Sequence, residues 1–522
     1  MSAPYLYTCS QRISRALLAP IILTTVTGGV AKAENKVSPP SEISTVPAPE
    51  HYKGASTARH AAASSAYLSG NTSWWEIFHD STLDGLERSA LDANQDLRQS
   101  VSRVLEARAQ ARHTAADFFP TVTAPMHATR ERTTNTGPVT RSRLVGSGFF
   151  PTASSATGGA VPDTFAGQAL ANTFNDFQAQ LSLSYEIDVF GRIRHNYGQA
   201  LAAAQATEAE RRAVELGLTA QVAANYFNLR ALDSQTEILR RTARLRADAV
   251  QIESERVQAG VAKDLDVSRA QLEQANTNAE LADIVQQRNA AENALAVLCG
   301  RPASEFHVAS QPLGENPPPA VPPGIPAQLL SRRPDLIEAE RKVAGSSEGV
   351  KSARAQFYPT FTVQANYGYE SANSDQWFED QSHTWSITGG ISVPIFEGGR
   401  NVANLDGAKA RRDEALASYR QTALTAFKEA EDALNALRQR SLQAESRSQA
   451  SKSAQRVFTA SQESYREGTI NYFEVIDAQR GLLDAELAEV QTLSARYEAT
   501  IDLIRALGGG YGSAPQTKRI AK

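Results

Sequence analysis

Two long stretches without proline constrain the fold of this chain more than any other feature of its sequence. No proline occurs from Asp163 to Arg301 or from Ile395 to Ala514. Residues 193–259 can therefore form one continuous helix, about 100 Å long at 1.5 Å per residue. A heptad seam follows late in the chain, formed by Ile476, Leu483, Val490, Tyr497 and Ile504. This pattern predicts long coiled-coil-like hairpins instead of a globular core.

The sequence is internally duplicated. Phe118-Phe119-Pro120 recurs as Phe357-Tyr358-Pro359 at an offset of 239, and Arg192, Gly260 and Val267 recur as Arg400, Gly468 and Val475 at an offset of 208. The offset falls because the first half carries an insertion, which we place in the loop 131–176. Each half is predicted to contain a helix, two strands joined by a loop, and a long helical hairpin with its turn near residue 260 or 468.

Four segments alternate between apolar and polar residues as β-strands with one apolar face do. They are predicted at about 118–130, 177–190, 357–370 and 384–396, each close to the length of a strand that crosses a bilayer. Aromatic residues gather at their ends, as at membrane interfaces: Phe118, Phe119, Phe174, Phe177, Phe190, Tyr358, Trp377, Phe378 and Phe396. A soluble antiparallel sheet would also alternate, but four such strands in one exported chain favour a membrane barrel.

Four strands cannot close a barrel by themselves. The smallest membrane barrels have about eight strands, and an open edge in lipid leaves backbone groups unpaired at several kcal/mol each. The strand count therefore predicts a barrel that is shared between subunits.

The remaining segments are assigned by composition. Residues 1–33 resemble a secretory signal peptide, because Arg12 and Arg15 precede an apolar run and Ala31-Lys32-Ala33 follows it as the cleavage site. The alternative is a membrane anchor, but the apolar run is shorter than the roughly 20 residues of a spanning helix. Residues 34–73 are expected to form a flexible N-terminal segment. A proline-rich linker at 302–326 separates the first repeat, 74–301, from the second, 327–511, and residues 512–522 are expected to be a disordered tail.

Composition argues against several classes of function. The formal net charge of −4 gives no support for nucleic acid as a partner. Cys9 and Cys299 cannot build a disulfide framework, and the eight histidines show no metal-ligand spacing. Phosphate-binding loops and nucleophile elbows are absent from the sequence. We therefore expect no enzymatic activity, no cofactor and no metal site.

Several short motifs occur in the order and at the distances that are typical of one family. They are Trp74-Trp75 with Phe78 and Asp80, Arg332-Arg333-Pro334-Asp335-Leu336, Gly398-Gly399-Arg400, Asp477-Ala478-Gln479-Arg480, and Ala506-Leu507-Gly508-Gly509-Gly510-Tyr511. With the paired strand starts, they make the chain resemble the TolC-like outer-membrane efflux family, and more closely its OprM/NodT-type subgroup. The resemblance covers nearly all of the mature chain.

The resemblance implies an α+β membrane protein of the bacterial outer membrane. Members are homotrimers with a 12-stranded barrel, four strands from each subunit, continuous with a long α-helical periplasmic tunnel. They contact a periplasmic adaptor and an inner-membrane RND-type pump, and they export drugs or other small toxic compounds. The alternative within this fold is the duct of a type I protein secretion system. A third reading, a structural coiled-coil protein of the envelope, leaves the four strands unexplained.

The resemblance also places a periplasmic gate on the helix after the second turn. Phe473 corresponds to an apolar constriction, and Asp477 and Arg480 to residues that link neighbouring subunits. Glu474 and its first-half equivalent Asp266 are further gate candidates. Independently of the family, Asp477 and Arg480 are helix neighbours, and three-fold symmetry would repeat them as rings of charge. The alternative is a solvated helix face whose ion pairs contribute about 0–1 kcal/mol.

The hairpin turns are candidates for contact with the adaptor. They contain Gly260, Val261, Ala262, Gly468, Thr469 and Ile470, although any helical hairpin can require a glycine at its turn. One departure from the family concerns the N-terminus. Many OprM-like members carry a lipid-modified cysteine directly after the apolar signal run, but Cys9 precedes that run, so we expect no lipid anchor.

Overall fold

The structure is a computed structural model, and it describes residues 49, 52–53, 73–132, 173–314, 316–322 and 326–510. All of them belong to a single structural unit, residues 39–522. The expected signal peptide and Cys9 lie outside the described residues. So do most of the N-terminal segment 34–73, the central part of the loop 131–176, and the tail 512–522.

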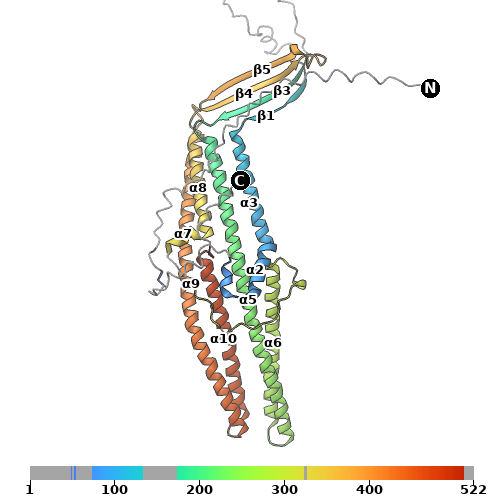
Figure 1. Cartoon of the computed structure of the whole chain (residues 1–522), viewed down its shortest axis with the longest axis vertical. Helices are drawn as coiled ribbons and strands as arrows, with labels where there is room; N and C mark the ends of the chain where they lie inside the picture. Colours follow the sequence, from blue (N-terminus) through green and yellow to red (C-terminus); the bar gives the residue numbers. More distant parts are fainter. Residues whose placement is uncertain are drawn as a thin grey trace, which may run out of the picture. The chain divides into compact units, whose positions relative to one another are not determined.

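The four longest helices reproduce the duplication to the residue. Helices α5 (Arg192–Gln258) and α9 (Arg400–Arg466) each have 67 residues, and α6 (Asp264–Leu298) and α10 (Tyr472–Ala506) each have 35. Both ends of α9 and of α10 follow their first-half counterparts by 208 residues. The continuous helix expected over 193–259 therefore corresponds to α5. The pairs α5–α6 and α9–α10 form two antiparallel hairpins (Figure 1).

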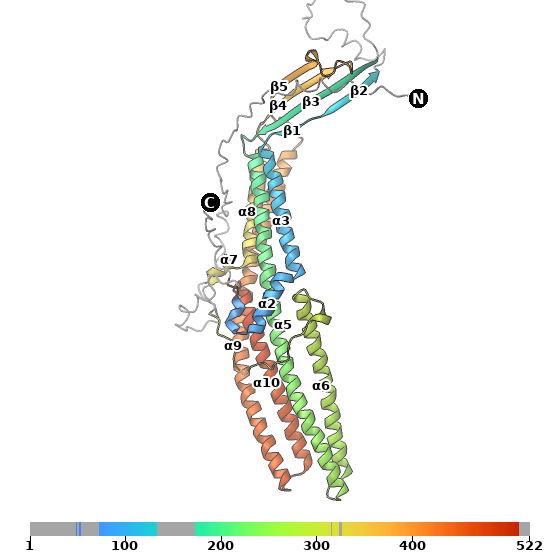
Figure 2. The same cartoon turned by 45° about the vertical axis from the view of Figure 1, so that its right-hand side comes forward.

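Shorter helices pack beside the halves of α5 and α9 that lie nearest the sheet. Helix α3 (Gln95–Ala115) contacts α5, α5 contacts α8 (Pro334–Ala355), and α8 contacts α9, so the helices form a wall in the order α3–α5–α8–α9 (Figure 1). Figure 2 shows α3 and α5 side by side in the turned view. The capping side chains of Asp80 and Asn94 begin α2 (Ser81–Ala93) and α3. Short elements complete the chain: α7 (Leu329–Arg332) and the 3₁₀ turns η2 (Trp74–Phe78), η3 (Ala116–Phe118), η5 (Ala303–Glu305), η6 (Pro326–Gln328) and η7 (Asp380–Ser382).

One antiparallel sheet lies at the end of this wall. Its strands are β1 (Thr121–Thr123), β2 (Met126–Arg132), β3 (Thr173–Ile187), β4 (Thr360–Ser371) and β5 (His383–Ser392). They pair in the order β1–β3–β4–β5, and β2 also pairs with β3. The register aligns the apolar residues, since Leu181 lies opposite Tyr367 and Tyr367 opposite Trp385. The apolar sets of all strands therefore share one face of the sheet.

The strand boundaries differ from the expected ones where proline intervenes. The first strand, expected over about 118–130, is split into β1 and β2 at Pro125, which has no N–H to give to the ladder. Pairing of β2 with β3 continues to Arg132 and Thr173, so strand residues occupy both ends of the segment expected as a loop, 131–176. Strand β5 ends at Ser392, shortly before Pro394, instead of at 396.

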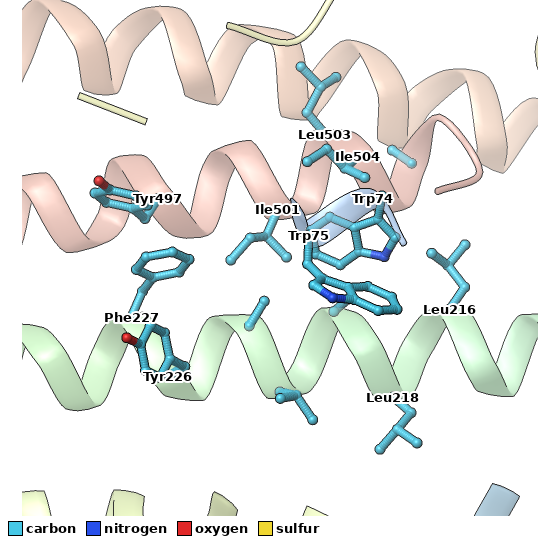
Figure 3. Packing of buried hydrophobic residues seen from close by; sticks show 14 of the residues in the cluster. Trp74, Trp75, Leu216, Leu218, Tyr226, Phe227, Tyr497, Ile501, Leu503 and Ile504 are labelled. Carbon is cyan, nitrogen blue, oxygen red and sulfur yellow. The ribbon is translucent and has the colours of Figure 1, made fainter. Parts of the chain in front are cut away.

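The core lies where α5, α10 and the η2 turn meet (Figure 3). Trp74 and Trp75 are buried, and the indole N–H of Trp74 donates to Thr219 Oγ1 at 3.1 Å. The rings of Phe227 and Tyr497 stack with their centroids 4.2 Å apart. The Trp-Trp motif therefore packs the first hairpin against the second.

A buried polar network fixes the start of the inter-repeat linker on the first hairpin. Both carboxylate oxygens of Asp233 are bound: Arg288 Nε and Ser310 Oγ donate to one at 2.9 and 2.8 Å, and the backbone N–H of Gln311 to the other at 3.0 Å. The side chain of Arg230 also donates to the carbonyl of Ala309 at 2.6 Å. This part of the linker is thus held by α5 and α6.

Candidate functional site at the hairpin ends

The two hairpins end in turns of the same geometry. Gly260 and Gly468 have φ of 75° and 77°, a left-handed conformation that favours glycine. The N–H of the next residue, Val261 or Thr469, donates to a carbonyl of the preceding helix at 2.9 Å in both cases. The predicted tip residues lie in these turns, and Val261 is exposed. Ile470 instead packs against the apolar cluster of Phe458, Val475, Ala478 and Leu482.

The structure places Phe473 and Asp266 next to the same arginine, Arg269. The guanidinium of Arg269, on α6, lies 5.5 Å from the centroid of the Phe473 ring on α10. Arg269 also forms an ion pair with Asp266 at 3.6 Å. Half of the Phe473 side chain remains exposed. Two gate candidates from different repeats are therefore connected within one chain through Arg269.

Glu474 takes part in the start of α10. Its backbone N–H donates to Asn471 Oδ1 at 3.3 Å, and Asn471 Nδ2 donates to Glu474 Oε1 at 3.4 Å. This exchange caps the first turn of the helix, where a carboxylate is also favoured by the helix dipole. A local structural role therefore accounts for Glu474 in the single chain.

Arg480 finds its partner within its own chain, whereas Asp477 does not. Arg480 Nη2 donates to Glu273 Oε1 on α6, and this bond raises the pKa of the arginine. Asp477 is exposed, and its charge also raises the pKa of Arg480, but its side chain forms no hydrogen bond or ion pair with the described residues. Of the two residues expected to link neighbouring subunits, one is already engaged with the first hairpin.

Glu273 is buried and already paired on its own hairpin. Its Oε2 lies 3.3 Å from Arg246 Nη2 of α5, and Arg246 Nη1 donates to the Glu273 carbonyl at 2.9 Å. Arg246 also donates to Thr277 Oγ1. Burial lowers the pKa of Arg246, an effect that the Glu273 carboxylate opposes. The site thus combines two arginines with one carboxylate.

A second link joins α9 to α5 nearer the turns. The hydroxyl of Tyr465 donates to Glu253 Oε1 at 2.5 Å, and the guanidinium of Arg256 lies 4.9 Å from the Tyr465 ring centroid. Burial, the hydrogen bond and the Glu253 charge all raise the pKa of the Tyr465 hydroxyl. Tyr465 is therefore a neutral donor at physiological pH.

Sequence reasoning missed Glu273, Arg246, Tyr465 and Glu253. Glu273 and Arg480 are 207 residues apart, and Glu253 and Tyr465 are 212 apart, so no local periodicity connects them. The only available signal was the repeat itself, which predicts that the two hairpins run side by side. It does not say which charged residues meet.

The arrangement is suited to holding helices together. Within the described ranges, no group of three or more His, Cys, Asp or Glu residues could hold a metal ion. None of the helices there is both long and apolar enough to span a membrane.

Comparison with known proteins identifies what the chain resembles. The family model "Outer membrane efflux protein" matches residues 86–301 and 325–509. The pyoverdine export outer membrane protein OpmQ of Pseudomonas aeruginosa is 32% identical over 458 residues, which are 88% of this chain and 91% of OpmQ. The toluene efflux pump outer membrane protein TtgI of Pseudomonas putida is 30% identical, with 84% and 87% covered.

Solved structures show the same fold. The outer-membrane channel OprN superposes with a TM-score of 0.76 at 27% identity, covering 91% of this chain and 99% of OprN. The open state of the Neisseria gonorrhoeae MtrE outer membrane channel gives 0.73 at 26% identity, covering 90% and 98%. These matches confirm the family resemblance and the largely helical, channel-type fold.

Proposed function

The chain belongs to the outer membrane efflux protein family, and from this premise we propose that it is the passive exit duct of a tripartite efflux system. As a member, it is an outer-membrane efflux protein of a family of channels, not of enzymes. The proposal adds a homotrimer with a 12-stranded barrel and a periplasmic helical tunnel. One observation carries this proposal: both the sheet and the helical wall end in edges that have no partner in the described part of the chain.

The sheet supports a shared barrel. Its apolar face exposes Leu181, Tyr367, Trp385, Ile387 and Ile391, as a lipid-facing surface would. Its edges, β1 with β2 on one side and β5 on the other, have no further strand partner in the described part of the chain. Open strand edges in lipid are costly, and strands of neighbouring copies would pair with them.

The helical wall supports the same assembly. Its outer helices expose apolar side chains, Val101 and Leu105 on α3 and Val402 and Leu424 on α9. The duplication also suggests the register in which α9 of one copy meets α3 of the next. Inside a chain, α5 meets α8 where Ser352 Oγ donates to Asn196 Oδ1 at 2.5 Å. The repeat equivalent of Asn196 is Asn404 on α9, 208 residues later, and that of Ser352 is His113 on α3, 239 residues earlier. Both are exposed in the single chain.

The hairpin ends supply the gate in this proposal. Three copies would arrange Phe473 as an apolar constriction and Asp477 as a ring of carboxylates open to Arg480 of a neighbouring copy. Arg480 has five N–H donors, so its bond to Glu273 leaves donors for a second carboxylate. Glu474 and Asp266 would add negative charge beside the constriction.

The partners follow from the family and from the relatives. OpmQ is named for pyoverdine export and TtgI for toluene efflux, which supports drugs or other small compounds as the exported class. The turns at Gly260–Ala262 and Gly468–Ile470 would contact a periplasmic adaptor, and the adaptor an inner-membrane RND-type pump.

Planar bilayers test the duct directly. The purified protein should run as a trimer in detergent and conduct ions, and Asp477→Ala with Arg480→Ala should raise its conductance because the gate loses both charges. Absence of both trimer and conductance would refute the duct. Cross-linking the turns to co-expressed adaptors distinguishes drug efflux from the alternative, a type I protein secretion duct.

A further inference from the structure

The first hairpin carries a preformed acceptor for a cation. Arg246 is held by the Glu273 carboxylate, the Glu273 carbonyl and Thr277 Oγ1, and all three residues are buried. The carboxylate uses Oε2 for Arg246, so Oε1 is free to accept from another helix. Helices α5 and α6 thus fix the position and direction of this oxygen.

The second hairpin supplies the matching donor. Arg480 lies on α10 with 48% of its side chain exposed, whereas only 6% of the Glu273 side chain is exposed. Its guanidinium reaches from the surface of α10 to Glu273 Oε1. An exposed arginine on one hairpin therefore meets a buried carboxylate on the other.

We propose that Glu273 is a further gate residue, which positions Arg480 and holds the second hairpin against the first in the closed state. The inference rests on the proposed duct function. In a trimer, Arg480 would connect Glu273 of its own chain with Asp477 of a neighbour. Loss of Glu273 would therefore loosen the gate even with Asp477 and Arg480 in place.

The charge balance makes this contact reversible. An unpaired buried carboxylate would strongly oppose opening. When α10 moves away, however, Glu273 keeps Arg246 as its partner and is not left unpaired. Arg480 returns to solvent, where a half-exposed arginine is readily hydrated. The Tyr465–Glu253 bond differs, because Glu253 is buried and its nearest other cation, Arg256 Nε, is 4.0 Å away. The Glu273–Arg480 pair can thus break while its buried carboxylate keeps a close cationic partner.

Conductance of the purified full-length protein in planar bilayers tests the role of Glu273. Glu273→Gln should raise conductance by about fivefold, the shift expected when each chain loses the Glu273–Arg480 ion pair. The same change also removes the charge that Arg246 pairs with, although the glutamine oxygen can still accept a hydrogen bond from Arg246. Arg480→Gln, which leaves the buried Arg246–Glu273 pair intact, should raise it to a similar extent. The double variant should exceed neither single variant, because both remove the same contact. Asp283→Asn, an exposed charge change on the same helix, is the matched control and should leave conductance unchanged.

Trimer melting in detergent separates gating from folding. The proposal predicts that the Arg480→Gln trimer has the same melting temperature as the unmodified protein but a higher conductance. An effect of Arg480→Gln with none of Glu273→Gln would show that Arg480 acts only through a neighbouring copy, and would overturn the inference. If the unmodified protein forms no pore, the proposed duct function itself fails.

Discussion

Helices α5 and α9 are the same length and occupy equivalent positions in the two repeats, yet their surroundings differ sharply. Of 67 residues in each, 26 are buried in α5 and 8 in α9. Helix α5 contacts α3, α6, α8 and α10, whereas the main contacts of α9 are with α8 and α10. Leu216 and Leu424 illustrate the difference, because they are equivalent by the offset of 208 but are 6% and 60% exposed.

The contrast supports the proposal that a neighbouring copy completes the second repeat, because the described residues leave much of α9 exposed. Each of the two duplicated helices must bury its apolar residues against neighbouring helices, because a single helix cannot bury them by itself. In the first repeat the chain supplies that cover itself. In the second, apolar residues on α9 such as Leu424 are exposed in the described structure, and in the proposed ring of copies a neighbouring copy would cover them.

The largest effect is expected from a charge at the uncovered position. Leu424→Glu should abolish the trimer without unfolding the single chain, because it places a carboxylate in the proposed contact with the next copy. Light scattering in detergent measures the assembly, and circular dichroism measures the helix content. Leu424→Met is the control and should remain trimeric. If the Leu424→Glu protein is still trimeric, the proposed contact of a neighbouring copy with Leu424 on α9 is wrong.

The two repeats also differ at Asp233, which belongs to the buried network that holds the linker, and at its equivalent in the second repeat. Asp233→Ala should lower the free energy of unfolding by about 3–5 kcal/mol, because Arg230 and Arg288 lose a buried partner. The equivalent position in the second repeat is Ser441, whose hydroxyl donates only to the Leu437 carbonyl. Ser441→Ala should change the stability by less than about 0.5 kcal/mol. Urea titration in detergent compares the two, and equal effects would contradict the difference between the repeats.

Glu87 makes the stability of the packing of α2 on α5 depend on pH. It lies on α2, which packs on α5, and burial together with the Asp84 charge raises its pKa to about 9. Because the folded pKa is above the unfolded one, its contribution to stability is greatest below about pH 4.5 and is lost as pH rises towards 9. The slope is about 1.4 kcal/mol per pH unit.

Glu87→Gln should remove this slope and stabilise the protein at pH 8. Melting temperatures between pH 5 and 9 provide the measurement, and Glu76→Gln, at an exposed position of the η2 turn, is the control. An unchanged pH profile of Glu87→Gln would show that Glu87 is not buried in the neutral form.

The smallest effect is expected at the link between α9 and α5. Tyr465→Phe keeps the ring under Arg256 and removes only the hydrogen bond to Glu253, which should lower stability by about 1–3 kcal/mol because Glu253 is a buried charge. Thermal melting and bilayer conductance should both respond. If neither changes, the hairpins are held together without this bond.

Much of the fold could be predicted from the sequence, because its features recur. The offset of 208 placed both hairpin turns, and the absence of proline predicted α5 as one helix. Alternation located four strands, but it did not reveal that Pro125 divides the first of them. The extension of β2 and β3 to Arg132 and Thr173 was also hidden, since Thr, Ser and Gly in that segment are typical of loops.

The site was less predictable. The family resemblance led to Phe473, Asp477 and Arg480, but a resemblance transfers only positions that match a motif. Glu273 and Arg246 belong to no motif, and a buried charge has no signature in a single sequence. Only the structure shows that Arg246 holds Glu273 and that Glu273 in turn contacts Arg480.

Disulfide trapping between copies tests the central claim most directly. His113→Cys and Asn404→Cys, introduced together, should form a bond between α3 of one copy and α9 of the next, in the register that Ser352 and Asn196 show within the chain. The account predicts a covalent trimer on a non-reducing gel, and Glu280→Cys with Asn404→Cys should give none. A protein that stays monomeric on the gel under oxidising conditions would contradict the proposal that neighbouring copies complete the wall.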